Sequence, residues 1–283
     1  MQQEDFMSPP TDYNSDFFGL VSEGSFNSAQ IILPIVVDLV QPKSVIDVGC
    51  GQGIWLSVLK QLGIDDILGL DGDYIQKCEL KIPEYNFQAQ DLTQSFKFDR
   101  KFDLVMSLEV AEHLPEEESI SFVTSLTNLG KVILFSAAIP FQGGVNHVNE
   151  QWQNYWVKKF SKLGYVAVDC IRYRVWNNSQ VDFWYAQNTF LFIDKNSLDS
   201  YPKLKEEFQK TNFSSLPIVH PKKYLEKHQD NQNLSKSLEW YKYQSDPNNW
   251  YFKDIVRAMP KSFVKGIKLT LNNLIKLGSS KNN

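Results

Sequence analysis

Four histidines are the candidate bases of this chain, and two of them follow predicted strands. His113 comes after the strand predicted at 102–108, and His147 lies in a glycine-containing loop after the strand predicted at 131–137. Because the carboxyl ends of parallel strands meet at one edge of a sheet, both imidazoles should converge there. A neutral imidazole can take the proton of a reacting hydroxyl. We predict His147 as the base and His113 as the second candidate; a structural hydrogen bond for His113 and simple loop docking for His147 are the alternatives.

Two carboxylates precede or adjoin His113 in the segment EVAEH. Glu109, Glu112 and His113 could, together with His147, supply the oxygen and imidazole ligands that Mg²⁺ or Mn²⁺ bind. We predict a site without metal and keep this cation site as the alternative.

A glycine triplet stands where a strand changes into a helix, in SVIDVGCGQG. Gly49, Gly51 and Gly53 permit positive φ and let the backbone approach a ligand without a Cβ in the way. The alternative is a tight turn with no ligand. Asp47 precedes the triplet, and the resulting spacing is Gly-x-Gly-x-Gly rather than Gly-x-Gly-x-x-Gly.

Two further acids end the next predicted strands. Asp71, in ILGLDGD, can accept both hydroxyls of a ribose. Asp91, in AQDL, can accept from an exocyclic amine, with Leu92 packing on an aromatic base. The plainer alternatives are a helix cap for Asp71 and a turn residue for Asp91. Together with the glycines, these acids indicate a cofactor that contains adenosine.

Strands that alternate with amphipathic helices must position these residues, and this order predicts a parallel, doubly wound sheet. The last two strands have no predicted helix between them and should form an antiparallel pair at one edge. The predicted strands are 44–48, 67–70, 87–90, 102–108, 131–137, 165–172 and 188–194. The first predicted helix lies within 25–42, with Ser25 or Ser28 near its cap and Pro42 after its end. The other predicted helices are 54–62, 73–80, 120–129 and 152–163, the last with Asn149 as a cap.

Composition excludes several classes of protein. The chain has 283 residues, 42% of them hydrophobic, and a net charge of −4, which argues against a broad phosphate-binding surface and against nucleic acid as a partner. Three widely spaced cysteines suggest neither a disulfide framework nor a zinc site. No signal peptide or membrane span is recognisable, so we expect a cytoplasmic protein. The oligomeric state is left open.

Three regions follow from these patterns: a cap segment over 1–24, a ligand-binding domain over 25–196, and a C-terminal extension over 197–283. The extension ends in a stretch from Pro260 with five lysines and no acid, which could rest weakly on an anionic membrane, although docking on the domain is the more ordinary interpretation. The helical face predicted there comprises Phe263, Ile267, Leu271 and Leu274, and the aromatic residues predicted to close over the cofactor are Tyr13, Phe17 and Phe18.

Over about Ser25 to Lys195 the sequence resembles the class I S-adenosylmethionine-dependent methyltransferases. VIDVGCGQG is similar to their first motif, LGLDGD to their acidic ribose loop, AQDL to their adenine-contacting turn, and FDLVMSLEVAEHLP to their fourth-strand motif. HVNEQWQNYW resembles, more weakly, a segment of a small-molecule or glycan-modifying branch. Cys50 departs from the family by standing between the glycines, where many relatives have a small residue.

The resemblance implies a Rossmann-like fold with a seven-stranded, mostly parallel sheet and S-adenosylmethionine as cofactor. It implies transfer of a methyl group to a hydroxyl of a small molecule or carbohydrate. The cofactor contacts that it implies are Asp47, Gly49 and Gly51 for the amino-acid part, Asp71 for the ribose, and Asp91 and Leu92 for the adenine. Gly53 and Leu108, at the end of the fourth strand, complete the predicted cofactor-binding residues.

Three rival interpretations remain at this point. The EVAEH grouping resembles the metal site of small-RNA 2′-O-methyltransferases, although the acidic charge disfavours RNA. A nicotinamide-dependent dehydrogenase also uses a glycine turn and an acid, but the glycine spacing and the terminal strand pair speak against it. The third rival is a module that binds the cofactor without catalysis.

Overall fold

The computed structural model describes residues 15–75, 79–249, 251, 253, 257, 260, 263, 265–270 and 272. The chain divides into two compact units, Met1–Lys223 and Tyr224–Asn283. The predictions for Tyr13, Leu271 and Leu274 lie outside the described residues, as do those for the side chains of Phe17 and Phe18.

The first unit is built on a seven-stranded sheet in the order β3-β2-β1-β4-β5-β7-β6. Strands β1 to β5 run parallel, whereas β7 pairs antiparallel with both β5 and β6. The antiparallel pair at the edge is therefore confirmed. The strands are β1 Ser44–Val48, β2 Asp66–Asp71, β3 Phe87–Ala89, β4 Leu104–Leu108, β5 Val132–Ser136, β6 Tyr165–Val168 and β7 Phe190–Asp194.

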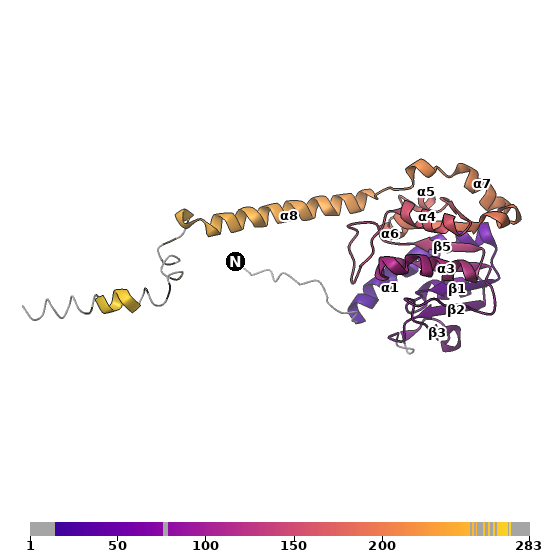
Figure 1. Cartoon of the computed structure of the whole chain (residues 1–283), viewed down its shortest axis with the longest axis horizontal. Helices are drawn as coiled ribbons and strands as arrows, with labels where there is room; N and C mark the ends of the chain where they lie inside the picture. The colour runs from indigo at the N-terminus through magenta and orange to yellow at the C-terminus, as the bar shows by residue number, and fades with distance from the viewer. Residues whose placement is uncertain are drawn as a thin grey trace, which may run out of the picture. The chain divides into compact units, whose positions relative to one another are not determined.

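Helices cover both faces of the sheet and bury two hydrophobic clusters (Figure 1). Successive residues of a strand point to opposite faces, so Val45 packs in the cluster with α1 and α2, and Ile46 packs in the cluster with α3 and α4. The central strands are buried on both faces, which explains their unbroken apolar sequences. The helices are α1 Ser15–Val40, α2 Ile54–Gln61, α3 Ser119–Leu129, α4 Gln153–Lys162, α5 Arg172–Val175, α6 Phe183–Asn188, α7 Pro202–Lys210 and α8 Pro221–Ser245.

The first helix begins earlier than its sequence suggests. α1 starts at Ser15, so Ser25 and Ser28 lie inside the helix and the predicted caps are wrong. Both hydroxyls are buried and serve tertiary contacts instead. Ser25 Oγ lies 3.2 Å from the Tyr185 hydroxyl, and Ser28 Oγ accepts from the backbone N–H of Asp182 at 3.0 Å.

The connection between β6 and β7 also differs from the prediction. Two short helices, α5 and α6, lie where no helix was expected, and β6 ends at Val168 rather than at 172. In the helix predicted at 73–80, the described residues 73–75 form a turn. Asn149 does not cap α4, because Trp152 precedes that helix and the Asn149 amide donates to Ser119 Oγ at 3.1 Å.

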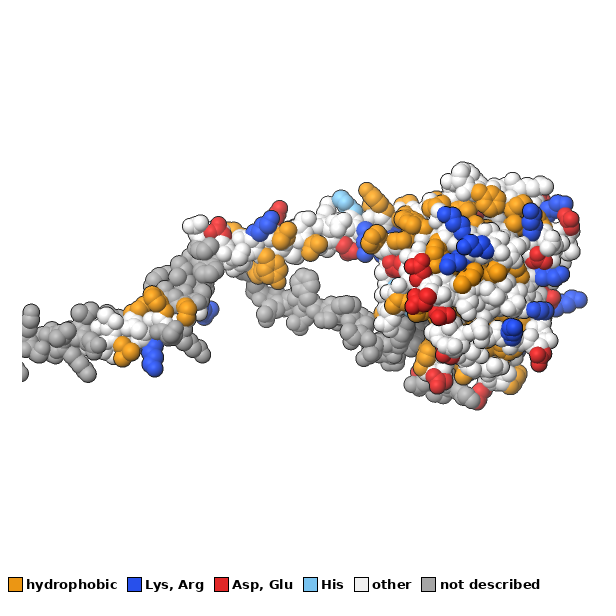
Figure 2. Space-filling view, viewed as in Figure 1, with side chains coloured by type: hydrophobic (Ala, Val, Ile, Leu, Met, Phe, Trp, Pro, Cys, Tyr) orange, Lys and Arg blue, Asp and Glu red, His pale blue; other side chains and the backbone are white. Residues whose placement is uncertain are grey.

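The chain continues to pack on the sheet after β7. Leu204 of α7 and Leu216 are buried in the two clusters, and the first compact unit extends to Lys223, so the domain limit predicted at 196 falls inside it. Helix α8, by contrast, has no buried residue, and its mixture of apolar and charged side chains is exposed (Figure 2). In the described part of the chain no helix combines the length and the apolar character needed to cross a membrane.

Candidate active site

The glycine turn between β1 and α2 has the positive φ angles that its sequence predicts. Gly49, Gly51 and Gly53 have φ of 83°, 52° and 78°. A Cβ at Gly49 would lie 2.3 Å from Val110, and one at Gly53 would lie 2.8 Å from Ile82, so these two positions are closed by packing. A Cβ at Gly51 would meet no atom within 4 Å. The middle glycine therefore presents bare backbone to open space, which suits a closely approaching ligand.

Asp71, at the end of β2, connects directly to this turn. Its Oδ2 accepts from the backbone N–H of Gly51 at 2.7 Å, and its Oδ1 accepts from the N–H of Gly72 at 2.7 Å and the hydroxyl of Tyr74 at 2.5 Å. The acid and the glycine turn predicted as one site are thus brought together by hydrogen bonds.

Asp47 is a buried acid beneath the same turn. Burial, together with the negative charge of Asp71, raises the pKa of its carboxyl from 3.8 to about 7. The ionised form is therefore disfavoured in the protein without a ligand, and a cation placed beside it would relieve this penalty.

Replacing Asp47 with Asn should stabilise the unliganded protein above pH 7. A carboxyl whose pKa rises on folding contributes stability that is present below the unfolded pKa and is lost as the pH rises through about 7. We expect Asp47→Asn and the wild type to differ little in free energy of unfolding near pH 4, and the variant to gain up to about 4 kcal/mol by pH 8. Urea unfolding across this pH range measures the difference. A variant less stable than the wild type at pH 8 would contradict a pKa of Asp47 that is raised by burial.

The two residues predicted to contact adenine, Asp91 and Leu92, make contacts within the protein. Asp91 is exposed, and its Oδ1 accepts from Thr93 N at 2.9 Å and Thr93 Oγ1 at 2.6 Å, which lowers the pKa of Asp91. Leu92 packs partly buried against the core, and Leu108 is buried at the end of β4. The adenine contacts stay a prediction.

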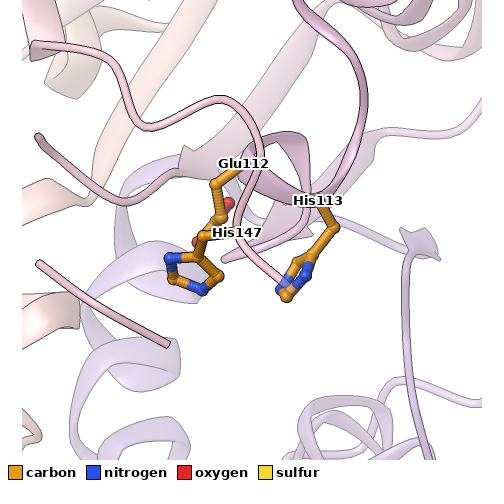
Figure 3. Close-up of side chains that lie close together, drawn as sticks. All are labelled: Glu112, His113 and His147. Carbon is orange, nitrogen blue, oxygen red and sulfur yellow. The ribbon is translucent and has the colours of Figure 1, made fainter. Parts of the chain in front are cut away.

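The two candidate bases lie side by side, as their positions after β4 and β5 predict. The imidazole centroids of His113 and His147 are 4.8 Å apart, with the rings nearly perpendicular. Glu112 lies next to these two histidines (Figure 3). One possible metal-ligand atom from each of the three residues, a carboxylate oxygen or a ring nitrogen, lies within 4.8 Å of the others. The sheet thus brings His147 next to His113 and Glu112, which precede it by 34 and 35 residues in the sequence.

Buried atoms without partners mark this cluster. Among the described residues, Glu112 Oε2 and His113 Nδ1 are buried and make no hydrogen bond. Burial lowers the pKa of His113 to about 4, helped by the charge of His147. Burial and the neighbouring charge of Glu109 raise the pKa of Glu112 well above its usual range. The cluster therefore pairs a neutral imidazole with a carboxyl that accepts from Ala138 N at 3.1 Å through Oε1 and has no partner for Oε2 among the residues that the structure describes.

Glu109 is close in sequence but is held by two side-chain amides. Gln142 Nε2 donates to its Oε2 at 2.8 Å and Asn188 Nδ2 donates to its Oε1 at 3.3 Å. Glu109 does not belong to the three-residue group that could hold an ion. Gln142 and Asn188 carry no sequence signal, because they come from other segments 33 and 79 residues away.

One carboxylate near the candidate bases, that of Glu150 in the loop after β5, was not predicted from the sequence. Glu150 Oε1 lies 3.0 Å from His147 Nδ1 and also accepts from Gly143 N at 2.7 Å, while its Oε2 accepts from Phe141 N at 2.6 Å. Its position three residues after a candidate base was the available signal.

Comparison with known proteins identifies the domain. Residues 28–216, about two thirds of the chain, match a family described as a methyltransferase domain. A sugar N-methyltransferase from a Streptoalloteichus species has the same fold, with a TM-score of 0.51 at 12% identity over 69% of this chain and 98% of that one.

The curated relatives match a shorter part of this chain than the family does. The ubiquinone biosynthesis O-methyltransferase of Methylococcus capsulatus is 26% identical over 129 residues, 40% of this chain and 54% of that protein. The protein of the same name from Proteus mirabilis is 28% identical over 35% of this chain and 45% of its own length. The chain thus spans about half the length of these relatives. On the family match, the chain belongs to the methyltransferase-domain family, and residues 28–216 form a domain of the S-adenosylmethionine-dependent methyltransferase type with a Rossmann-like fold.

Proposed function

We propose that the enzyme methylates a hydroxyl of a small molecule or sugar, with His147 as the general base. The observation that carries this proposal is the imidazole of His147, which Glu150 holds at 3.0 Å beside His113 at the end of the sheet that carries the glycine turn. The names of the curated relatives, both O-methyltransferases, support a hydroxyl acceptor. The cytoplasmic location, the absence of nucleic-acid partners and the weak membrane contact stay predictions.

The residues around the glycine turn fit the cofactor. S-adenosylmethionine supplies an electrophilic methyl group on a sulfonium. Asp47 would face its cationic amino-acid part, next to the bare backbone of Gly51, and Asp71 would accept from the ribose hydroxyls. The predicted contacts that complete this set are Gly49, Gly53, Asp91, Leu92 and Leu108.

His147 suits the base role better than His113 does. A pKa of about 4 makes the His113 imidazole a weak proton acceptor at neutral pH, because burial opposes its charge. His147 has a carboxylate at 3.0 Å that would stabilise the imidazolium formed when it takes a proton.

The loop around His147 also bears on the acceptor. Phe141 and Val148 have exposed fractions of 81% and 65%, and both lie within six residues of His147 in the chain. Exposed apolar side chains in the loop that carries a candidate base favour an acceptor with an apolar or aromatic part over a plain sugar.

Replacing His147 with Gln should lower turnover by about 10²- to 10⁴-fold and leave the affinity for S-adenosylhomocysteine within a few-fold. Turnover is measured as methyl transfer to catechol as an aromatic hydroxyl, methyl glucoside as a sugar hydroxyl and an amino sugar as an amine. His220→Gln is the control, because its Nε2 contacts the Trp176 carbonyl in another part of the domain. Full turnover in His147→Gln removes the base role, and transfer to the amine alone removes the hydroxyl acceptor.

A second candidate function is metal-assisted methylation, in which a divalent cation activates the hydroxyl. One observation favours it: Glu112 Oε2 and His113 Nδ1 are buried without partners next to His147, as metal ligands are before an ion binds. Glu112, His113 and His147 would hold the ion, which would lower the pKa of a bound hydroxyl.

Titration with Mn²⁺ tests this candidate independently of activity. We expect the protein, after treatment with a chelator, to bind one Mn²⁺ by electron paramagnetic resonance, and Glu112→Gln to lose at least about tenfold in affinity because it removes a ligand charge. Glu117→Gln, at an exposed position in the following turn, is the control. Equal Mn²⁺ affinity in wild type and Glu112→Gln excludes the metal.

A further inference from the structure

Glu150 is the centre of the loop between β5 and α4. One carboxylate accepts from the backbone N–H groups of Phe141 and Gly143 and contacts His147 Nδ1, at 2.6, 2.7 and 3.0 Å. The side chains of Glu150 and His147 are only 19% and 12% exposed, so water weakens these contacts little. The same group therefore shapes the loop and touches the candidate base.

The loop that Glu150 holds is strained. Phe141 and Asn146 have φ of 66° and 59°, in the left-handed region that costs residues other than glycine about 1 to 3 kcal/mol each. Packing does not hold Phe141 in this conformation, because its side chain is 81% exposed. The Glu150 carboxylate holds the backbone N–H groups of Phe141 and Gly143, on either side of Gln142, whose own side chain donates to Glu109. Such strain is typical of functional sites.

The carboxylate also decides which nitrogen of His147 carries a proton. An ionised carboxylate only accepts hydrogen bonds, so the 3.0 Å contact requires a proton on Nδ1. A neutral imidazole carries one ring proton, which leaves a lone pair on Nε2.

A glycine keeps that second nitrogen uncovered. A Cβ at position 144 would lie 2.2 Å from His147 Nε2, so any side chain there would collide with the ring. In the described part of the chain, no hydrogen bond to this nitrogen is found. Glu150 on one side and Gly144 on the other therefore leave Nε2 as the free basic atom.

We propose that Glu150 is a positioning residue, which holds His147 as the Nδ1–H tautomer so that the Nε2 lone pair can act on the acceptor hydroxyl. The consequence for turnover rests on the proposed function, whereas the tautomer does not. In the proton transfer, Nε2 takes the hydroxyl proton as the oxygen bonds to the methyl group and the methyl–sulfur bond breaks. The resulting imidazolium lies beside the Glu150 carboxylate, which stabilises its charge.

The tautomer can be read without an acceptor. Long-range ¹H–¹⁵N spectra of the ¹⁵N-labelled full chain, at about pH 8 where imidazoles are neutral, distinguish Nδ1–H from Nε2–H rings. His147→Gln assigns the signal among the four histidines. We expect Nδ1–H in the wild type, and a shift towards Nε2–H, which free imidazole side chains favour, in Glu150→Ala. An Nε2–H ring in the wild type, or an unchanged tautomer in Glu150→Ala, overturns the proposal.

Turnover with catechol then tests the consequence. We expect Glu150→Ala to lower kcat about 10- to 100-fold with unchanged affinity for S-adenosylhomocysteine, as loss of an orienting partner does. Gly144→Ala should also lower kcat, because its Cβ would displace the His147 ring while the Glu150 carboxylate is still present. Glu117→Gln is the matched control. Full turnover in His147→Gln with an Nδ1–H ring in the wild type would refute the base role and still support the positioning by Glu150.

Discussion

Replacing Asp71 with Ala should weaken the binding of S-adenosylhomocysteine by at least about 100-fold, or about 2.7 kcal/mol. The Asp71 carboxylate accepts from Gly51 N and Gly72 N, both at 2.7 Å, so it holds the glycine turn against the end of β2. Hydrogen bonds to a charged group contribute about 1.5 to 3 kcal/mol each. The variant loses this support and the proposed ribose contact together. Isothermal titration calorimetry measures the affinity.

The neighbouring acid provides the control for this experiment. Asp73 is exposed two residues further along, and Asp73→Ala removes the same charge from the same loop without the contacts to the glycine turn. We expect its affinity to stay within about threefold of the wild type, because an exposed charge is screened by solvent. An affinity of Asp71→Ala within threefold of the wild type would refute the role of Asp71, provided that thermal melting shows the variant folded.

The central sheet could be predicted because its signal is local. Strands buried on both faces consist of unbroken apolar residues, so β1 was predicted at its observed bounds and β5 within one residue at each end. The site elements follow from this sheet: parallel strands bring Gly51 and Asp71 together, and the loops after β4 and β5 bring His113 and His147 together.

The parts that could not be predicted depend on partners distant in the sequence. α5 and α6 are four and six residues long and polar in part, and they are held by tertiary contacts rather than by a helical pattern. Ser25 looks like a cap but is buried against Tyr185, 160 residues away. Glu150 is a different case, because its partners lie only three to nine residues away but belong to an irregular loop, in which no periodicity indicates such a contact.

Replacing Arg172 with Met should destabilise the domain by about 3 to 5 kcal/mol. Arg172 is 2% exposed and forms two hydrogen bonds with Asp169, at 2.9 and 2.5 Å. Its Nη1 donates to the carbonyls of Leu216 at 2.8 Å and Gln187 at 3.2 Å, and its guanidinium lies 4.2 Å from the centroid of the Phe190 ring. Methionine would leave Asp169 unpaired and two carbonyls without a donor. Urea unfolding followed by near-ultraviolet circular dichroism measures the loss.

Arg174 gives the matched control, because it lies on the same short helix but is more accessible. Its side chain is 31% exposed and pairs with Glu207 at 3.3 Å, so Arg174→Met should destabilise the domain by only about 1 kcal/mol. Because Arg172 bonds the Leu216 carbonyl across 44 residues, its loss should also release the segment that follows α7. Hydrogen exchange at 211–216 should therefore rise in Arg172→Met and stay unchanged in Arg174→Met. Unchanged hydrogen exchange at 211–216 in Arg172→Met would mean that the buried guanidinium does not join this segment to the sheet.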